Sequence, residues 1–251
     1  MRQFTPYELN LLNRFGFDPD KAATDFPVDM PVEYITQKAE FRGLIFGVNE
    51  NVLIPRIETE EMIDLALKNL PSILEFRSSD FESLIFADVG TGSGCIGISF
   101  AVELQKMGRN FKGILSDNFN DAVETAINNV QNLLPNSAIE VIKSDLLANY
   151  PAVKFDIIFA NLPYIPEGRI LQNSVQNFEP HSALFGGPDG LNYIREFLKQ
   201  AKNFLANDGF IILEVDDTHT NSNEFTDWEI KHILDSNPKN RFWMAKKNSK
   251  I

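Results

Sequence analysis

An apolar run of strand length that ends in a glycine-rich turn constrains the fold of this chain more than any other segment. The run is Ser83-Leu-Ile-Phe-Ala-Asp-Val89, and it continues into Gly90-Thr-Gly-Ser-Gly94. A continuous apolar run of this length is typical of a strand buried on both faces, as in a parallel sheet. Glycines directly after such a strand let the chain turn into a helix and let its backbone approach a ligand, where a Cβ atom would collide.

The alternation of apolar strands and helical segments continues along the chain. Helices are predicted over about 58–70, 93–107, 120–134 and 191–205, and strands over 83–89, 111–116, 138–143, 155–160 and 210–215. This order predicts a doubly wound α/β fold, in which helices cover both faces of a mostly parallel sheet. Two more runs, 226–232 and 241–246, flank a turn at 235–240 and predict an antiparallel hairpin. The hairpin would complete a seven-stranded sheet at one edge.

The N-terminal region has a different character. Thr5 and Glu8 form a capping box, Pro6 suits the first position of a helix, and Gly16 supplies its end. We expect the prolines that follow to interrupt any regular element: Pro19, Pro27 and Pro31. We therefore predict a short helical appendage over residues 1–30, too small for a core of its own, and one large domain over residues 31–251.

Composition excludes several classes of protein. No apolar run approaches the roughly 18 residues that a membrane span needs, and the N-terminus lacks the apolar stretch of a secretory signal. Cys95 is the single cysteine, so an internal disulfide is impossible and a cytoplasmic location is expected. The net charge of −12 argues against direct, sequence-independent binding of nucleic acid, which depends on lysine and arginine.

Polar residues at the ends of successive strands indicate a cofactor site. Asp117 ends the second core strand, where a carboxylate can accept hydrogen bonds from two ribose hydroxyls, and Asp145 follows the third, within reach of an adenine amino group. The pattern suits S-adenosylmethionine, although Gly92-Ser-Gly94-Cys-Ile-Gly97 also satisfies the dinucleotide fingerprint of NAD proteins. No metal is implied, because the histidines lack ligand spacing: His181, His219 and His232. The candidate cofactor-binding residues are Asp88, Gly90, Thr91, Gly92, Ser93, Gly94, Asp117, Asp145 and Asn161.

A second motif, Asn161-Leu-Pro-Tyr164, directly follows the apolar run at 155–160. It combines a side-chain amide, a backbone carbonyl and an aromatic ring, held rigid by Pro163. Such a group can accept both protons of a planar NH2 group while the ring lies over it. In isolation the tetrapeptide could be a tight structural turn. After a cofactor loop, however, it indicates N-methyl transfer, with Asn161, Leu162, Pro163 and Tyr164 as catalytic and substrate-binding residues.

Several longer segments match one family. They are Pro31-Val-Glu-Tyr-Ile35, Val52-Leu-Ile-Pro-Arg-Ile-Glu-Thr-Glu60, Asp88-Val-Gly-Thr-Gly-Ser-Gly-Cys-Ile96, the Asn161 motif, and Phe178-Glu-Pro-His-Ser-Ala-Leu-Phe-Gly-Gly-Pro-Asp-Gly-Leu191. With them the chain resembles the N5-glutamine methyltransferases that modify peptide chain release factors. The resemblance implies S-adenosylmethionine as cofactor, methylation of the Gly-Gly-Gln glutamine, and a role in translation termination. Arg56 and Glu58 lie in one of these segments and are candidates for the substrate entrance or for a structural ion pair. A monomer is the expected state.

The chain departs from the family pattern at three places. Leu162 stands where the family usually has proline, and adenine-N6 methyltransferases of ribosomal RNA also use Asn-Leu-Pro-Tyr. We expect a shortened N-terminal domain, since only about 30 residues precede the matching part. Residues 216–224 are short and polar where the family has a helix. Two other functions therefore stay open: adenine-N6 methylation of RNA or DNA, and a cofactor-binding partner protein without catalytic activity.

Overall fold

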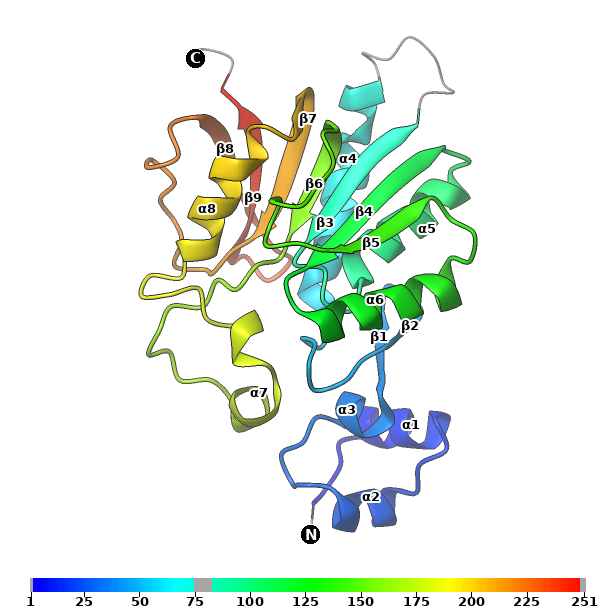
Figure 1. Ribbon diagram of the computed structural model, residues 1–251. Coiled ribbons are helices and arrows are strands. Elements are labelled where there is room, and N and C mark those ends of the chain that lie inside the picture. Colours follow the sequence, from blue (N-terminus) through cyan, green and yellow to red (C-terminus); the bar gives the residue numbers. More distant parts are fainter. Residues whose placement is uncertain (1, 75–82, 249–251) are drawn as a thin grey trace.

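The computed structural model describes residues 2–74 and 83–248. Its centre is a seven-stranded sheet in the order β5-β4-β3-β6-β7-β9-β8 (Figure 1). Neighbouring strands from β5 to β7 run parallel, and β9 is antiparallel to both β7 and β8. The predicted fold class is therefore confirmed, including the C-terminal hairpin at the sheet edge. The strands are β3 (Leu84–Val89), β4 (Phe111–Asp117), β5 (Ile139–Lys143), β6 (Phe155–Ala160), β7 (Leu205–Glu214), β8 (Trp228–Leu234) and β9 (Asn240–Lys247).

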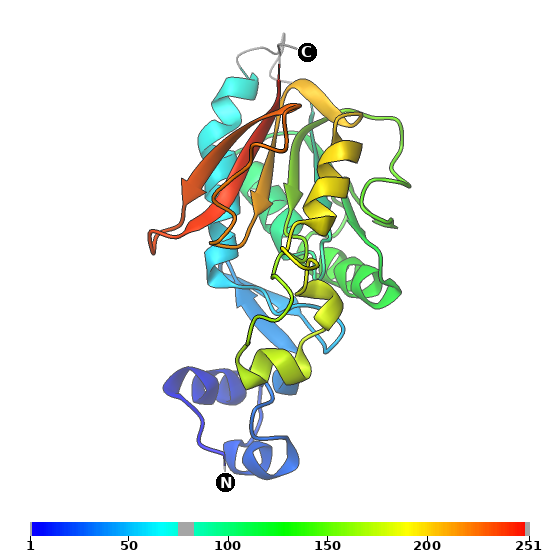
Figure 2. The ribbon, with the colours of Figure 1, turned by 90° about the vertical axis from the view of Figure 1, so that its left-hand side faces the viewer.

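Helices cover both faces of this sheet. One face packs against α4 (Glu60–Leu74), α5 (Cys95–Lys106) and part of α6 (Asn120–Leu133), and the other against α8 (Asn192–Ala201). Figure 2 shows α4 and α8 on opposite sides of the sheet. The apolar strands are buried on both faces for this reason, and every residue of β6 is buried.

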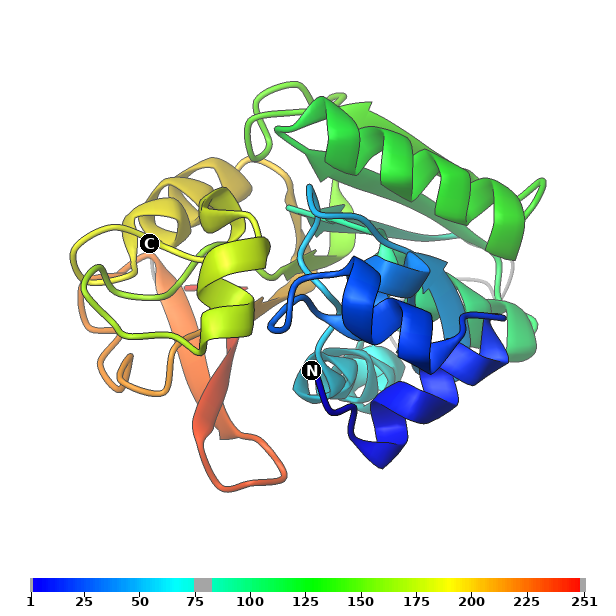
Figure 3. The ribbon, with the colours of Figure 1, turned by 90° about the horizontal axis from the view of Figure 1, so that it is seen from below.

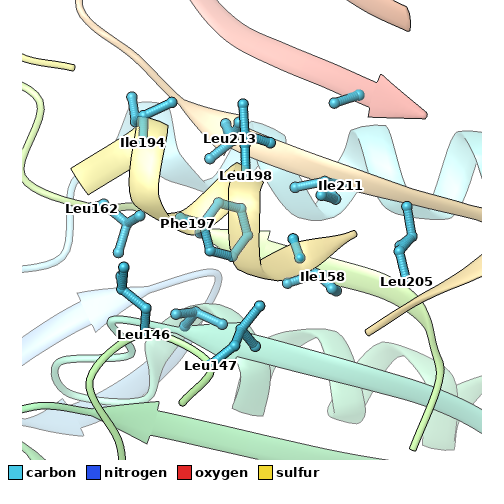
Figure 4. Close-up of a cluster of buried hydrophobic side chains, with 14 of the residues drawn as sticks. Leu146, Leu147, Ile158, Leu162, Ile194, Phe197, Leu198, Leu205, Ile211 and Leu213 are labelled. Atoms are coloured by element: carbon cyan, nitrogen blue, oxygen red, sulfur yellow. The ribbon is translucent and has the colours of Figure 1, made fainter. Parts of the chain in front are cut away.

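The core between α8 and the sheet illustrates this packing (Figure 4). Phe197 and Leu198 of α8 are essentially fully buried against the sheet residues Ile158, Ile211 and Leu213. The polar face of α8 stays outside, as the helical spacing of its apolar residues predicts. Because β6 is fixed between two packed layers, the residues that follow it start from a rigid position.

The N-terminal residues form a small unit at one end of the sheet. It contains α1 (Pro6–Arg14), α2 (Pro19–Asp25), α3 (Val32–Thr36) and the antiparallel hairpin of β1 (Lys38–Phe41) and β2 (Leu44–Gly47). The capping box of Thr5 and Glu8 is confirmed. One apolar cluster joins these helices to residues as far along as Val52 and Ile54, so the packed unit extends beyond residue 30. The domain boundary near residue 30 stays a prediction.

Three sequence-based expectations for secondary structure were wrong. Pro19 does not interrupt structure but begins α2, because its fixed φ suits the first helical position and the Asp18 side chain caps the helix. The Asn-Asp-Gly turn at 207–209 is absent, and β7 runs through it with a register shift opposite β6. The predicted helix over 191–205 ends at Ala201, where β7 soon begins.

The remaining connections are short. Residues 215–227, between β7 and β8, contain no helix, as expected from their polar sequence. The loop after β6 carries α7 (Asn173–Phe178) and leads to two single-turn 3-10 helices' counterpart at His181–Ala183; another 3-10 turn, Ile57–Thr59, precedes α4. Among the described residues, no helix has the length and apolar content needed to cross a membrane.

Candidate active site

The turns after β3, β4, β5 and β6 open into one cavity, which we call the central cavity. Parallel register brings these strand ends to one level, since Val89 lies opposite both Ser116 and Ala160. The cavity contains about 1050 Å³ of space free of protein atoms, counting its open mouth. Sites for small molecules typically span about 300–1,000 Å³. Its walls come from the four turns and from a segment before α4: residues 90–93, 117–119, 144–146, 161–163 and 51–53.

The glycine-rich turn forms one wall, but its residues have different positions. Gly90, Thr91, Gly92 and Ser93 line the central cavity. Gly92 has φ +55°, and a Cβ atom there would point into open space. Gly94 does not line the cavity and instead occupies the N-cap position of α5.

Asp88 lies beneath the turn and not in the cavity. Its side chain is fully buried, and its Oδ2 accepts hydrogen bonds from Thr91 Oγ1 (2.6 Å) and Gly97 N (2.9 Å). Burial raises the pKa of Asp88 to about 6. Asp88 therefore holds the turn in shape, and the expectation that it contacts a cofactor directly is wrong.

The two other predicted acids line the cavity. Asp117 accepts hydrogen bonds from Gly92 N (3.0 Å) and Phe119 N (3.1 Å), and burial raises its pKa. Asp145 is exposed at the cavity edge. Sequence reasoning missed Phe119 and Leu146, which add apolar surface to the same wall. Leu146 has φ +52°, a conformation that is uncommon for leucine and that clusters at functional sites.

The Asn161 motif lies where the cavity meets β6. Asn161, Leu162 and Pro163 line the cavity, and the Leu162 side chain is buried in the core. Asn161 Nδ2 donates a hydrogen bond to Glu214 Oε2 (3.0 Å). Within the described part of the chain, no group donates to Asn161 Oδ1 or to the Leu162 carbonyl. Two acceptor atoms of the motif are thus available to a ligand.

The segment at 178–191 holds this motif from behind. Gly186 lies so close to the Pro163 carbonyl oxygen, and Gly190 so close to the Tyr164 carbonyl oxygen, that a Cβ atom at either position would collide. The backbone around Ile165 is tied to the same segment, since Gly186 N donates to Ile165 O (2.9 Å). Glycine at these positions is therefore required by close packing against the motif.

A second hollow, which we call the N-terminal groove, adjoins the cavity. It is bordered by parts of the N-terminal unit, by residues 54–58, by Tyr164 and by residues on and around α7. Figure 3 shows α1–α3 and α7 over the same end of the molecule. Arg56 lines both hollows and Glu58 lines the groove. Arg56 pairs with the buried Glu179, so the alternative of an Arg56–Glu58 ion pair was wrong.

Sequence reasoning also missed Glu214, which lies at the junction of these features. It is the last residue of β7, its side chain is 1% exposed, and Asn161 and Tyr164 both donate hydrogen bonds to it. No local motif marks this position. The pairing of Ala160 with Leu213 is what brings Glu214 beside Asn161.

Comparison with known proteins agrees with this geometry. The methyltransferase small domain family model matches residues 59–190. A release factor glutamine methyltransferase of Borreliella burgdorferi is 36% identical over 208 residues, which cover 82% of this chain and 64% of that protein. The chain thus spans less than two thirds of that relative's length. The protein of the same name from Bacillus cereus is 33% identical over 215 residues, covering 82% of this chain and 72% of the relative.

A solved structure shares the fold. The N-terminal domain of human METTL16, in complex with SAH, superposes with a TM-score of 0.53 at 15% identity, covering 90% of this chain and 77% of that one. At this level of identity the likeness extends to the fold. The family follows from the closer relatives and the family model: this chain belongs to the methyltransferase small domain family and, by its curated relatives, to the release factor glutamine methyltransferases.

Proposed function

We propose that this protein transfers a methyl group from S-adenosylmethionine to the side-chain amide nitrogen of a glutamine. The substrate is the Gly-Gly-Gln glutamine of a peptide chain release factor. One observation carries the proposal. Two unoccupied acceptor atoms, Asn161 Oδ1 and the Leu162 carbonyl oxygen, lie on the wall of a cavity of cofactor size, and Tyr164 of the same motif faces an open groove. Methyl transfer between a small cofactor and a protein side chain requires this arrangement.

The residues of the central cavity fit the cofactor. Gly92 presents backbone without a side chain, and Asp117 keeps further lone pairs for ribose hydroxyls beyond the backbone bonds it accepts. Phe119 and Leu146 offer apolar surface suited to an adenine ring. Asp145, at the edge, is in a place to accept from the adenine amino group. The family and the SAH in a structure of the same fold support this assignment.

When bound, S-adenosylmethionine supplies an electrophilic methyl group on a sulfonium centre. The glutamine amide is a poor nucleophile because its nitrogen lone pair is delocalised. Asn161 Oδ1 and the Leu162 carbonyl would accept its two N–H groups, orient the nitrogen and stabilise the positive charge that grows on it. Tyr164 would pack against the amide plane and exclude water, while Pro163 keeps the backbone rigid. No strong base is needed, because the methylated nitrogen loses its proton readily.

The N-terminal groove offers a path for the substrate. It leads from the surface to Tyr164, and three apolar side chains on it are well exposed: Tyr7, Val28 and Ile57. Arg56, which lines both hollows, and Glu58 stand where a protein loop would enter. A loop that carries glutamine between two glycines is narrow enough to reach the motif from this side. The proposal includes a cytoplasmic location, where release factors act, and a monomeric enzyme.

Asn161→Ala tests the assignment of the motif. Loss of one positioned hydrogen-bond partner typically costs about 2.7–4 kcal/mol in the transition state, so methyl transfer to release factor should fall by about 10²–10³-fold. Affinity for S-adenosylmethionine, measured by calorimetry, should change only a few-fold. Retained activity in this variant would remove Asn161 from the mechanism. Methylation of an RNA or DNA adenine by the wild type, without methylation of release factor, would favour the adenine-N6 function.

A further inference from the structure

Glu214 is a carboxylate in a place where carboxylates are costly. It ends β7 in the middle of the sheet, and its side chain is 1% exposed. A buried carboxylate is strongly unfavourable unless several donors or a cation compensate it. Such a group is therefore worth examining for what its partners gain from it.

Three side chains donate hydrogen bonds to Glu214. Thr59 Oγ1 and Asn161 Nδ2 donate to Oε2 at 2.7 and 3.0 Å, and the Tyr164 hydroxyl donates to Oε1 at 2.8 Å. Arg241 Nη1 lies 3.7 Å from Oε1 and supplies positive charge. Two of the three donors belong to the Asn161 motif. Glu214 thus connects both ends of that motif to the rigid sheet.

The contact with Asn161 has a directional consequence. An amide side chain has a donor end and an acceptor end of nearly the same shape, whereas an ionised carboxylate can only accept. Glu214 therefore holds the NH2 end of Asn161, and Oδ1 is left at the other end without a donor from the described residues. If the amide turned by 180°, it would present its own NH2 group to the cavity, and an NH2 substrate would meet a donor.

We propose that Glu214 is a positioning residue that fixes the orientation of the Asn161 amide, so that Oδ1 is the atom offered to the substrate NH2 group. This inference rests on the proposed function. It assigns to the end of β7 a part in selecting the substrate, because the same orientation favours NH2 groups over groups that only accept. Tyr164 is held by the second oxygen of the same carboxylate, so the ring and the amide are set together.

A pair of substitutions tests the orientation directly. Glu214→Gln keeps the shape but lets either end of the new carboxamide face Asn161, so kcat should fall by about tenfold as the amide orientation is lost. Asn161→Asp places two carboxylates together and should lower kcat about a hundredfold or more. In the double variant N161D/E214Q, the new carboxamide can donate to the new carboxylate, whose other oxygen is again an acceptor toward the cavity. The double variant should be about tenfold more active than N161D alone.

Asp235→Asn is the matched control. Asp235 is also a buried carboxylate, and it accepts from Arg241 Nε (2.9 Å) but does not touch the Asn161 motif. Its substitution tests the effect of removing a buried negative charge near Arg241 on stability alone. We expect D235N to keep kcat within about twofold, since it leaves the hydrogen bonds of Asn161 unchanged.

A readout that needs no methyl transfer separates this inference from the proposed function. The side-chain NH2 signals of Asn161 in an NMR spectrum, identified by their loss in N161D, should exchange with solvent about tenfold faster in E214Q than in the wild type. Unchanged exchange, or a double variant no more active than N161D, would overturn the positioning role. If the wild type does not methylate release factor, the proposed function fails, while the exchange measurement still decides whether Glu214 orients Asn161.

Discussion

Two glycines with similar backbone angles give a direct test of the cofactor site. Gly92 in the cavity wall has φ +55°, and Gly108 after α5 has φ +67°. A Cβ atom at either position would meet no neighbouring atom within 4 Å. The substitutions Gly92→Ala and Gly108→Ala therefore impose the same kind of backbone strain and no steric clash within the protein. They differ in one respect, because Gly92 lines the central cavity and Gly108 does not.

The expected magnitudes follow from this difference. An alanine in the left-handed region costs about 1–2 kcal/mol, and reduced freedom of the unfolded chain returns about 0.4–1 kcal/mol. Both variants should thus lose about 1 kcal/mol in free energy of unfolding. Only Gly92→Ala puts a methyl group where backbone would meet the ligand, and an overlap of this size typically costs about 1–3 kcal/mol. The dissociation constant for S-adenosylmethionine should rise about tenfold or more for this variant alone.

Urea denaturation measures the first quantity and isothermal calorimetry the second. Equal losses of stability, with weakened cofactor binding in Gly92→Ala and unchanged binding in Gly108→Ala, would support the assignment of the cavity. The reasoning is refuted if Gly92→Ala binds the cofactor as tightly as the wild type. It is also refuted if Gly108→Ala weakens binding to the same degree, because the effect would then come from general destabilisation.

Three further predictions concern the same framework. Asp117→Ala should weaken calorimetric cofactor affinity by about tenfold or more, because it removes the acceptor for ribose hydroxyls; unchanged affinity would contradict the assignment. The pKa of Asp88 is raised from 3.8 to about 6 by burial, so its contribution to stability is full below about pH 4 and is lost as the pH rises through 6. Asp88→Asn lacks this loss, and its free energy of unfolding should gain on the wild type by up to about 3 kcal/mol between pH 4 and pH 7; a constant difference in urea titrations would contradict the shift. Phe100, buried between Phe86 and Phe159 at ring distances of 5.1 and 5.0 Å, should cost about 3–5 kcal/mol when replaced by alanine; a loss below 1 kcal/mol in the same assay would show that the core repacks around the gap.

Much of the fold and of the site is encoded in local sequence patterns. The turn at 88–94 and the motif at 161–164 were found because each follows a buried strand directly, and parallel strands bring such ends together. The Thr5 capping box was found because its signal lies within four residues. These features depend on neighbours in the chain, so periodicity and turn chemistry suffice to predict them.

The features that were missed depend on long-range pairing. Glu214 meets Asn161 across 53 positions, and Arg56 meets Glu179 across 123. The sequence near Glu214 reads as an ordinary strand end, and only the β6–β7 register reveals its partner. The hairpin of β1 and β2 was also missed, because its four-residue strands are too short to show a clear period. Such contacts become visible only when the sheet is assembled.

Mass spectrometry of release factor after incubation with this protein and S-adenosylmethionine tests the central claim most directly. The account predicts a mass gain equal to one CH2 unit, with fragmentation placing it on the side-chain amide of the Gly-Gly-Gln glutamine, and no gain with Asn161→Ala. A release factor whose Gly-Gly-Gln glutamine stays unmodified, although calorimetry shows that the cofactor binds, would contradict the account. A methyl group on any other residue would contradict it as well.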